Sequence, residues 1–84
     1  MGYKIILAPA AEKELDNAPA DVQRKVIAVF DVLAENPLMG KKLKGEYVGM
    51  YSVRAWPYRI MYRIFKKELL VSIVRIQHRK DAYR

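Results

Sequence analysis

The sequence predicts an α+β fold: one domain with the element order strand, two helices and three further strands (β-α-α-β-β-β). Residues 10–36 contain helical apolar spacing, whereas residues 48–77 are rich in β-branched and aromatic residues that partly alternate with polar ones. Eighty-four residues suffice for one small hydrophobic core, so we expect a single domain spanning residues 1–84. Because an apolar helix face needs a sheet to pack on, we expect a mostly antiparallel sheet with the helices packed on one side.

A first strand and a helical hairpin are expected in the N-terminal half. Residues 3–7 (YKIIL) form a short β-branched segment, and Pro9 stands where the first position of a helix tolerates proline. A short helix is then expected over residues 10–17. For the second helix, Asp21 is the expected N-cap and Asn36, which precedes a proline, is the expected end. Its apolar stripe consists of Val22, Val26, Val29, Phe30 and Leu33.

A basic loop and a three-stranded β-meander are expected in the C-terminal half. Residues 38–49 contain three glycines and three lysines with little periodicity, which is typical of a loop. Three strands joined by two tight turns are expected over residues 48–54, 58–65 and 69–77. The last strand carries apolar residues at both parities, so we expect it to be central and covered on both faces except at Arg75. In the first turn, Trp56 is expected to pack against the sheet edge.

Positive charge is concentrated in the second half of the chain. The net charge of +7 divides into −2 for residues 1–40, with four basic and six acidic side chains, and +9 for residues 41–84, with twelve basic and three acidic ones. A compact domain with this asymmetry presents one strongly positive face. Such a face suits phosphate-bearing or acidic protein partners, although a merely solubilising surface has the same composition.

The composition excludes several kinds of site. The chain has no cysteine, which excludes disulfides, thiol catalysis and thiolate zinc sites. No cluster of carboxylates or pair of histidines marks a metal site, so we expect neither a metal nor another cofactor. The apolar run IILAPAA is too short and too interrupted by proline to span a membrane, and it lacks the context of a signal peptide. We therefore expect a cytoplasmic protein with no membrane partner.

Arginines occur inside strand-like sequence from residue 50 onwards. Two faces of the segment YRIMYRIF follow from the two-residue period of a strand, one with Tyr58, Ile60, Tyr62 and Ile64 and the other with Arg59, Met61, Arg63 and Phe65. Burying an unpaired charge is strongly unfavourable, so fold stability does not explain guanidinium groups along a sheet. A bound anion would explain them. We expect one face to belong to the core and the other partly to a ligand.

The element order and four motifs, LKG, Y-x-V-R, YRIMYRI and the terminal HRKDAYR, together resemble the RelE branch of the RelE/ParE toxin superfamily. The resemblance covers essentially the whole chain and is strongest over residues 43–83. It implies a compact α+β fold and the toxin of a type II toxin–antitoxin pair, which enters the ribosomal A site and cleaves mRNA there.

The same resemblance implies two partners: a cognate antitoxin, acidic in its binding segment and forming a hetero-oligomer with the toxin, and the ribosome with its mRNA and rRNA. Two alternatives remain open. A ParE-like toxin would use the same fold to inhibit DNA gyrase by protein binding, and a non-toxic module would only capture RNA or an acidic protein. The HRKDAYR motif favours the mRNA endonuclease, because the alternatives do not need that basic and phenolic cluster.

Cleavage of RNA by its own 2′-hydroxyl needs a proton acceptor, cationic donors for the phosphorane and help for the departing 5′-oxygen. Matched to the family motif, Arg59 would hold the scissile phosphate, and Arg79 would stabilise the transition state or the leaving group. Tyr83 would stack on a base or accept a proton. Arg54 matches the basic position on the preceding strand, and His78 is added because imidazole titrates near neutrality.

The general base stays open on these grounds. RelE-like sites often carry lysines on the strand where this chain has Ser52 and Arg54, and arginine is a poor proton acceptor. The remaining candidates for the base are His78, Tyr83 and the loop residues Lys42 and Lys44. The expected catalytic set is Arg54, Arg59, His78, Arg79 and Tyr83. Contacts with RNA or the ribosome are expected from Lys41, Lys42, Lys44, Ser52, Arg63, Lys80 and Arg84.

Overall fold

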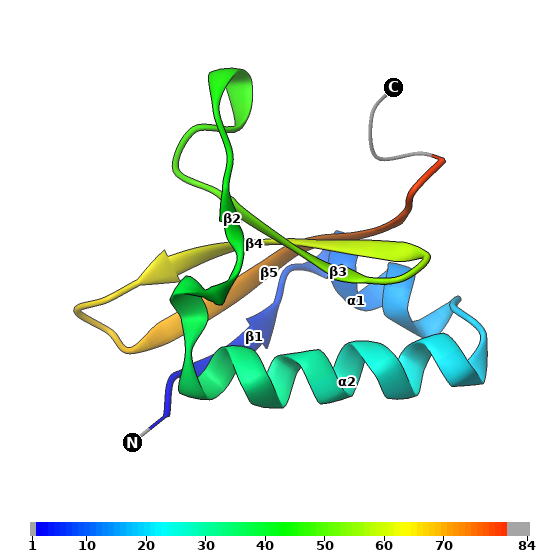
Figure 1. Ribbon diagram of the computed structural model, residues 1–84. Coiled ribbons are helices and arrows are strands. Elements are labelled where there is room, and N and C mark those ends of the chain that lie inside the picture. Colours follow the sequence, from blue (N-terminus) through cyan, green and yellow to red (C-terminus); the bar gives the residue numbers. More distant parts are fainter. Residues whose placement is uncertain (1, 81–84) are drawn as a thin grey trace.

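One five-stranded sheet carries both helices on the same side, and Figure 1 shows α1 and α2 below the strands. This computed structural model describes residues 2–80. The elements are β1 (Lys4–Leu7), α1 (Pro9–Asp16), α2 (Ala20–Glu35), η1 (Pro37–Met39), β2 (Lys41–Lys42), η2 (Gly45–Tyr47), β3 (Tyr51–Ala55), β4 (Tyr58–Phe65) and β5 (Leu70–His78). The expected α+β class is confirmed, and the segment expected to be a loop adds one short strand, β2.

The strands follow the order β1-β5-β4-β3-β2 across the sheet. The sheet is mostly antiparallel, as the sequence predicts: β1 pairs with β5 in parallel, and all other neighbouring strands are antiparallel. β5 therefore lies between β1 and β4, in the interior position that its apolar character predicts.

A β-bulge explains why β5 carries apolar residues at both parities. Met61 of β4 pairs with Arg75 of β5. The next residue, Tyr62, pairs with Ile73, so β5 contains one extra residue at this point. The extra residue shifts the two-residue period, and Ile73 and Ile76 both lie in the core. The expectation that β5 is covered on both faces is therefore corrected: the residues of its other face are only half-buried.

The core lies between the sheet and the predicted stripe of α2. From α2 it contains Val22, Val26, Phe30 and Leu33, with Val29 partly buried against them. Tyr62 of β4 is fully buried, and its hydroxyl donates to the Pro37 carbonyl at 2.7 Å and accepts from the Gly40 amide at 3.1 Å. Burial disfavours the phenolate and raises the pKa of Tyr62. These bonds tie η1 to the centre of the sheet.

Two element boundaries differ from the prediction. α2 begins at Ala20, so Pro19 takes the N-cap position and Asp21 lies in the first turn, without a side-chain cap hydrogen bond. A carboxylate in the first turn is still favoured by the helix dipole, which explains the residue type. The strand expected from residue 48 begins at Tyr51, because the preceding residues form η2 and its exit turn. Pro9 occupies the first turn of α1, as expected.

A carboxylate covers the edge of β5 beyond the end of β1. β1 pairs only with residues 70–73 of β5. Farther along, Glu14 of α1 accepts the Ile76 amide at 2.8 Å and binds the Arg75 guanidinium through three contacts of 2.8–3.2 Å. The edge is therefore satisfied without a strand, which limits uncontrolled pairing there. Within residues 2–80, no helix is long and apolar enough to cross a membrane.

Candidate nucleic-acid interface

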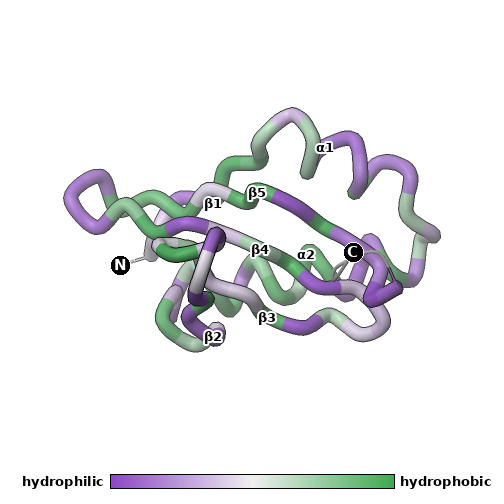
Figure 2. The backbone as a smooth tube through the Cα atoms, turned by 90° about the horizontal axis from the view of Figure 1, so that it is seen from above, coloured by the Kyte–Doolittle hydropathy of each residue, from purple (hydrophilic) through white to green (hydrophobic). Residues whose placement is uncertain are grey.

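The alternation of β3 and β4 separates an aromatic face from a basic one. Tyr51 and Tyr62 pair across the two strands and stack on the helix side, with ring centroids 5.6 Å apart. Arg54 and Arg59 also pair across the strands, at the opposite parity, and therefore project from the face that the helices leave open. Figure 2, seen from above, shows hydrophilic stretches interrupting β3, β4 and β5. We call this side of the sheet the open face.

Two cross-strand rows organise the open face. One row is Lys41, Ser52, Met61 and Arg75, and the next is Arg54, Arg59 and Gln77. In the first row, Ser52 is only 7% exposed and Met61 is also buried, so the centre of the face is compact. The cations surround this centre, which places charge where an anionic ligand can reach it.

A pocket of about 330 Å³ opens beside these rows. Its lining residues are Lys41, Lys42, Leu43, Lys44, Ser52 and Arg59. The pairing of β2 with β3 sets its geometry, since it holds Lys41 opposite Ser52. The structure thus brings the predicted lysines and Ser52 to the same place as Arg59. Arg54 lies next to the pocket, opposite Arg59. We call this the basic pocket; its cationic donors match the chemistry of a phosphodiester.

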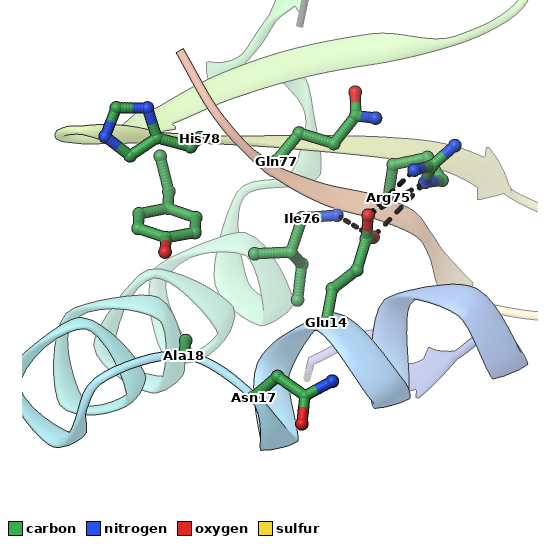
Figure 3. Close-up of a pocket in the computed structure, with 8 residues that line it drawn as sticks. Glu14, Asn17, Ala18, Arg75, Ile76, Gln77 and His78 are labelled. Carbon is green, nitrogen blue, oxygen red and sulfur yellow. Dashed lines mark hydrogen bonds and ion pairs between the residues drawn. The ribbon is translucent and has the colours of Figure 1, made fainter. Parts of the chain in front are cut away.

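His78 does not lie at the basic pocket. It lines a second pocket of about 350 Å³, shown in Figure 3, with Asn17 and Ala18. Its ring packs edge-on against Tyr58, with centroids 5.4 Å apart. Tyr58 packs against the core on the helix side, so the His78 ring and the arginine pair occupy different sides of the sheet. The Lys80 amide donates to His78 Nδ1 at 3.2 Å, which assigns the proton of the neutral ring to Nε2.

Arg79 lies at the end of β5 beside the β3–β4 turn. Its amide donates to the Pro57 carbonyl at 2.9 Å, one rung beyond the pairing of Tyr58 with His78. Its guanidinium carbon lies 5.0 Å from the centroid of the Trp56 ring. Trp56 is 56% exposed, so the expectation that it packs against the sheet edge is wrong.

The contact of Trp56 with Arg79 is the feature that sequence reasoning missed. The only available signal was the register, because pairing Tyr58 with His78 puts the turn opposite Arg79. Arg63 is exposed and is not among the residues that line the basic pocket. Its guanidinium lies near Gly49, where a Cβ would stand 3.8 Å from Nη1. Lys80 is exposed as well.

Two predicted residues, Tyr83 and Arg84, lie outside the described residues. Among residues 2–80, no three histidine or acidic side chains gather as a metal site would require.

Comparison with known proteins gives the family. Residues 5–83 match the model of a family described as the ParE toxin of the type II toxin–antitoxin system parDE. Toxin RelG of Mycobacterium tuberculosis is 35% identical over 86 residues, which cover 100% of this chain and 99% of RelG. Toxin RelE of the same organism is 30% identical, over 98% of this chain and 87% of RelE.

A solved structure agrees with these relatives. The toxin–antitoxin complex RelBE2 of M. tuberculosis contains a chain that is similar with a TM-score of 0.87 and 31% identity, covering 93% of this chain and 99% of that one. Family model, relatives and fold thus agree over nearly the full length, and the chain belongs to the RelE/ParE superfamily of toxins from type II toxin–antitoxin systems.

Proposed function

We propose that this toxin is an endonuclease that cleaves mRNA in the ribosomal A site, with the 2′-hydroxyl of the RNA as nucleophile and without a metal ion. The observation that carries the proposal is the basic pocket, in which Arg59 joins Lys41 and Lys44 on the open face. The relatives named RelG and RelE support it, as does the resemblance of the strand motifs to the RelE branch. Cleavage of mRNA would stop translation, and acting there would place the toxin in the cytoplasm.

The chemistry assigns distinct tasks to the cations. The 2′-oxygen attacks the phosphorus, the bond to the 5′-oxygen breaks, and negative charge rises on the phosphorane and then on the leaving oxygen. The planar fork of Arg59 suits two non-bridging oxygens of the scissile phosphate, with Arg54 beside it. Lys41 and Lys44 would hold neighbouring phosphates. Arg79 would stabilise the negative charge on the leaving oxygen until that oxygen takes a proton from water, since a guanidinium is a poor proton donor.

The general base must lie within reach of a phosphate bound at Arg59. His78 lines the other pocket, and its Nδ1 already accepts the Lys80 amide. It would have to turn away from Tyr58 to reach a phosphate at Arg59. Lys42 and Lys44 line the basic pocket itself. We therefore favour a loop lysine or Tyr83 as the proton acceptor.

Primer extension on a reporter mRNA after brief induction tests the proposal. Cleavage in codon register is expected from the native chain, and none from Arg59→Ala or Arg79→Ala, because each removes a cation from the transition state. Arg24→Ala is the matched control, since Arg24 is exposed on α2, away from the open face. A translation-blocked culture should show no cleavage. Toxicity and cleavage that survive in both site variants would overturn the proposal.

Inhibition of DNA gyrase is the second candidate, because the family model that matches describes ParE toxins. Such a toxin acts by binding a protein and needs no general base. DNA breaks and an SOS response, with mRNA intact, would favour gyrase inhibition over the endonuclease.

We also infer a cognate antitoxin as partner, since the similar RelBE2 structure is a toxin–antitoxin complex. With a net charge of +7, the chain favours an acidic segment that folds on binding and covers the basic pocket. The hetero-oligomer should be inactive in the cleavage assay. Full cleavage by the purified complex would contradict this mode of inhibition.

A further inference from the structure

Trp56 is exposed in a place where an apolar ring gains little from the fold. It is the single tryptophan of the chain, lies in the turn between β3 and β4, and does not belong to the core. Large aromatic side chains contribute most to stability when they are buried, so the 56% exposure of this residue suggests another role.

Two contacts bring the turn and the end of β5 together, and a third joins the turn to α2. The Arg79 amide is bound to the Pro57 carbonyl at 2.9 Å, and the Arg79 guanidinium lies over the Trp56 ring at 5.0 Å from its centroid. From the other side, Lys25 Nζ of α2 lies 3.4 Å from the Trp56 carbonyl oxygen. Backbone and side chain of Arg79 are thus both tied to one turn.

We propose that Trp56 is a positioning residue for Arg79: its ring holds the guanidinium ready for the phosphate. This inference rests on the proposed function. An exposed arginine samples many rotamers, and fixing it in the transition state costs conformational entropy. Contact with the ring restricts those rotamers before RNA arrives. The guanidinium carbon lies over the ring, and a cation–π contact does not use up the N–H donors, which remain available for phosphate oxygens.

A different role for Trp56, stacking directly on a base of the RNA, makes different predictions. Base stacking adds binding energy in both the ground state and the transition state, so its loss raises the half-saturating toxin concentration. Loss of a positioning interaction instead lowers the cleavage rate at saturation. A ring that acts only through Arg79 also has no further effect once Arg79 is gone.

The test is single-turnover cleavage of mRNA on programmed ribosomes, with toxin varied to saturation. The variants are Trp56→Ala, Trp56→Phe, Arg79→Ala and the double variant Trp56→Ala/Arg79→Ala. Phe65→Ala serves as the control for loss of an exposed aromatic ring, at the far end of β4.

We expect Trp56→Ala to lower the saturated rate about two- to five-fold, the size of an exposed cation–π contact. Trp56→Phe should recover part of this loss, and Phe65→Ala should behave as the native chain. The double variant should cleave no more slowly than Arg79→Ala. A multiplied loss in the double variant, a change confined to the half-saturating concentration, or a native rate in Trp56→Ala would each overturn the inference.

A measurement without RNA separates this inference from the proposed function. Because Trp56 is the single tryptophan, its fluorescence and near-ultraviolet circular dichroism report its surroundings directly. Arg79→Ala should change both signals, whereas Lys80→Ala should change neither. Unchanged spectra in Arg79→Ala would refute the contact whatever the toxin does. If the native chain fails to cleave mRNA while the spectra respond as expected, the proposed function falls and the Trp56–Arg79 contact stands.

Discussion

Arg54 and Arg59 lie directly opposite each other across β3 and β4, on the same face of the sheet. Opposed side chains in an antiparallel pair have Cβ atoms about 4.5–5.5 Å apart, and like charges at this distance destabilise the pair. The hairpin therefore sets two guanidinium groups opposite each other at the place where the basic pocket begins. A phosphate bound there would meet both guanidinium groups, which connects this pairing with the proposed activity.

Replacing Arg54 should stabilise the protein, and the gain should depend on salt. For Arg54→Thr we expect a gain of about 0.2–1 kcal/mol in the free energy of unfolding, because threonine suits a strand and one of two opposed like charges is removed. The gain should shrink as salt screens the charges. Urea unfolding at low and high salt measures both effects. Arg63→Thr is the control, since Arg63 faces Ser72 instead of a cation. Equal changes in the two variants would show that the opposed charges are not the cause.

Removing Glu14 should destabilise the end of β5. Glu14→Ala breaks the bond to the Ile76 amide and leaves Arg75 without this carboxylate, and we expect a loss of about 1–3 kcal/mol. Arg75→Ala should cost less, because the Arg75 side chain is 43% exposed and the amide keeps its acceptor. Urea unfolding of both variants, with the exposed Glu12→Ala on the same helix as control, tests the order. A larger loss for Arg75→Ala would mean that the ion pair outweighs the edge bond.

The buried hydroxyl of Tyr62 should govern part of the alkaline stability. Tyr62→Phe removes the bonds to the Pro37 carbonyl and the Gly40 amide, and at neutral pH we expect a loss of about 1–3 kcal/mol. The folded pKa of Tyr62 is raised by burial. Its contribution is therefore complete below the unfolded pKa of about 10 and is lost as the pH rises from there toward the folded pKa.

The pH dependence gives a second, independent check on Tyr62. Above a pH of about 10, the free energy of unfolding should fall more steeply in the native chain than in Tyr62→Phe. Tyr47→Phe is the control, because Tyr47 is partly exposed and lies outside the core. Parallel alkaline slopes for the native chain and Tyr62→Phe would show that this phenol does not couple to folding.

Local pattern was sufficient to predict much of the fold. The stripe of α2, the proline at the start of α1 and the alternation of β4 depend on neighbouring residues, and each appears as expected. The predicted start of α2 was wrong, because Pro19 takes the N-cap position where the pattern favours a side chain that can cap the helix. The predicted burial of β5 on both faces was also wrong, because the bulge between Met61 and Tyr62 changes which residues of β5 face the core and has no signal in the sequence.

The candidate site was predictable where residues share a strand and unpredictable where they meet through register. Arg54 and Arg59 follow from alternation within the β3–β4 hairpin. The lysines reach Arg59 because two residue pairs join β2 to β3. A glycine-rich segment with little periodicity gives no sequence signal for this short strand. His78 and Arg79 are adjacent in sequence, yet one packs on Tyr58 and the other on Trp56. Their adjacency in the sequence therefore led us to predict a single cluster at the end of β5 that the structure divides between two places.

The lysines of the basic pocket should supply a salt-dependent part of RNA binding. We expect the double variant Lys41→Ser/Lys44→Ser to bind a non-cleavable single-stranded RNA more weakly, because each lysine that neutralises a phosphate releases a counterion. A plot of log affinity against log salt should become shallower by about 0.7 for each lysine–phosphate pair that the substitutions remove. Fluorescence anisotropy over a salt series measures both quantities.

The control for this prediction is Lys66→Ser/Lys67→Ser. It removes the same charge from the exposed β4–β5 turn, outside the lining of the basic pocket, and should change the slope less. If both double variants lower the slope equally, net charge rather than the pocket attracts the RNA, and the case for a phosphate site at Arg59 is lost.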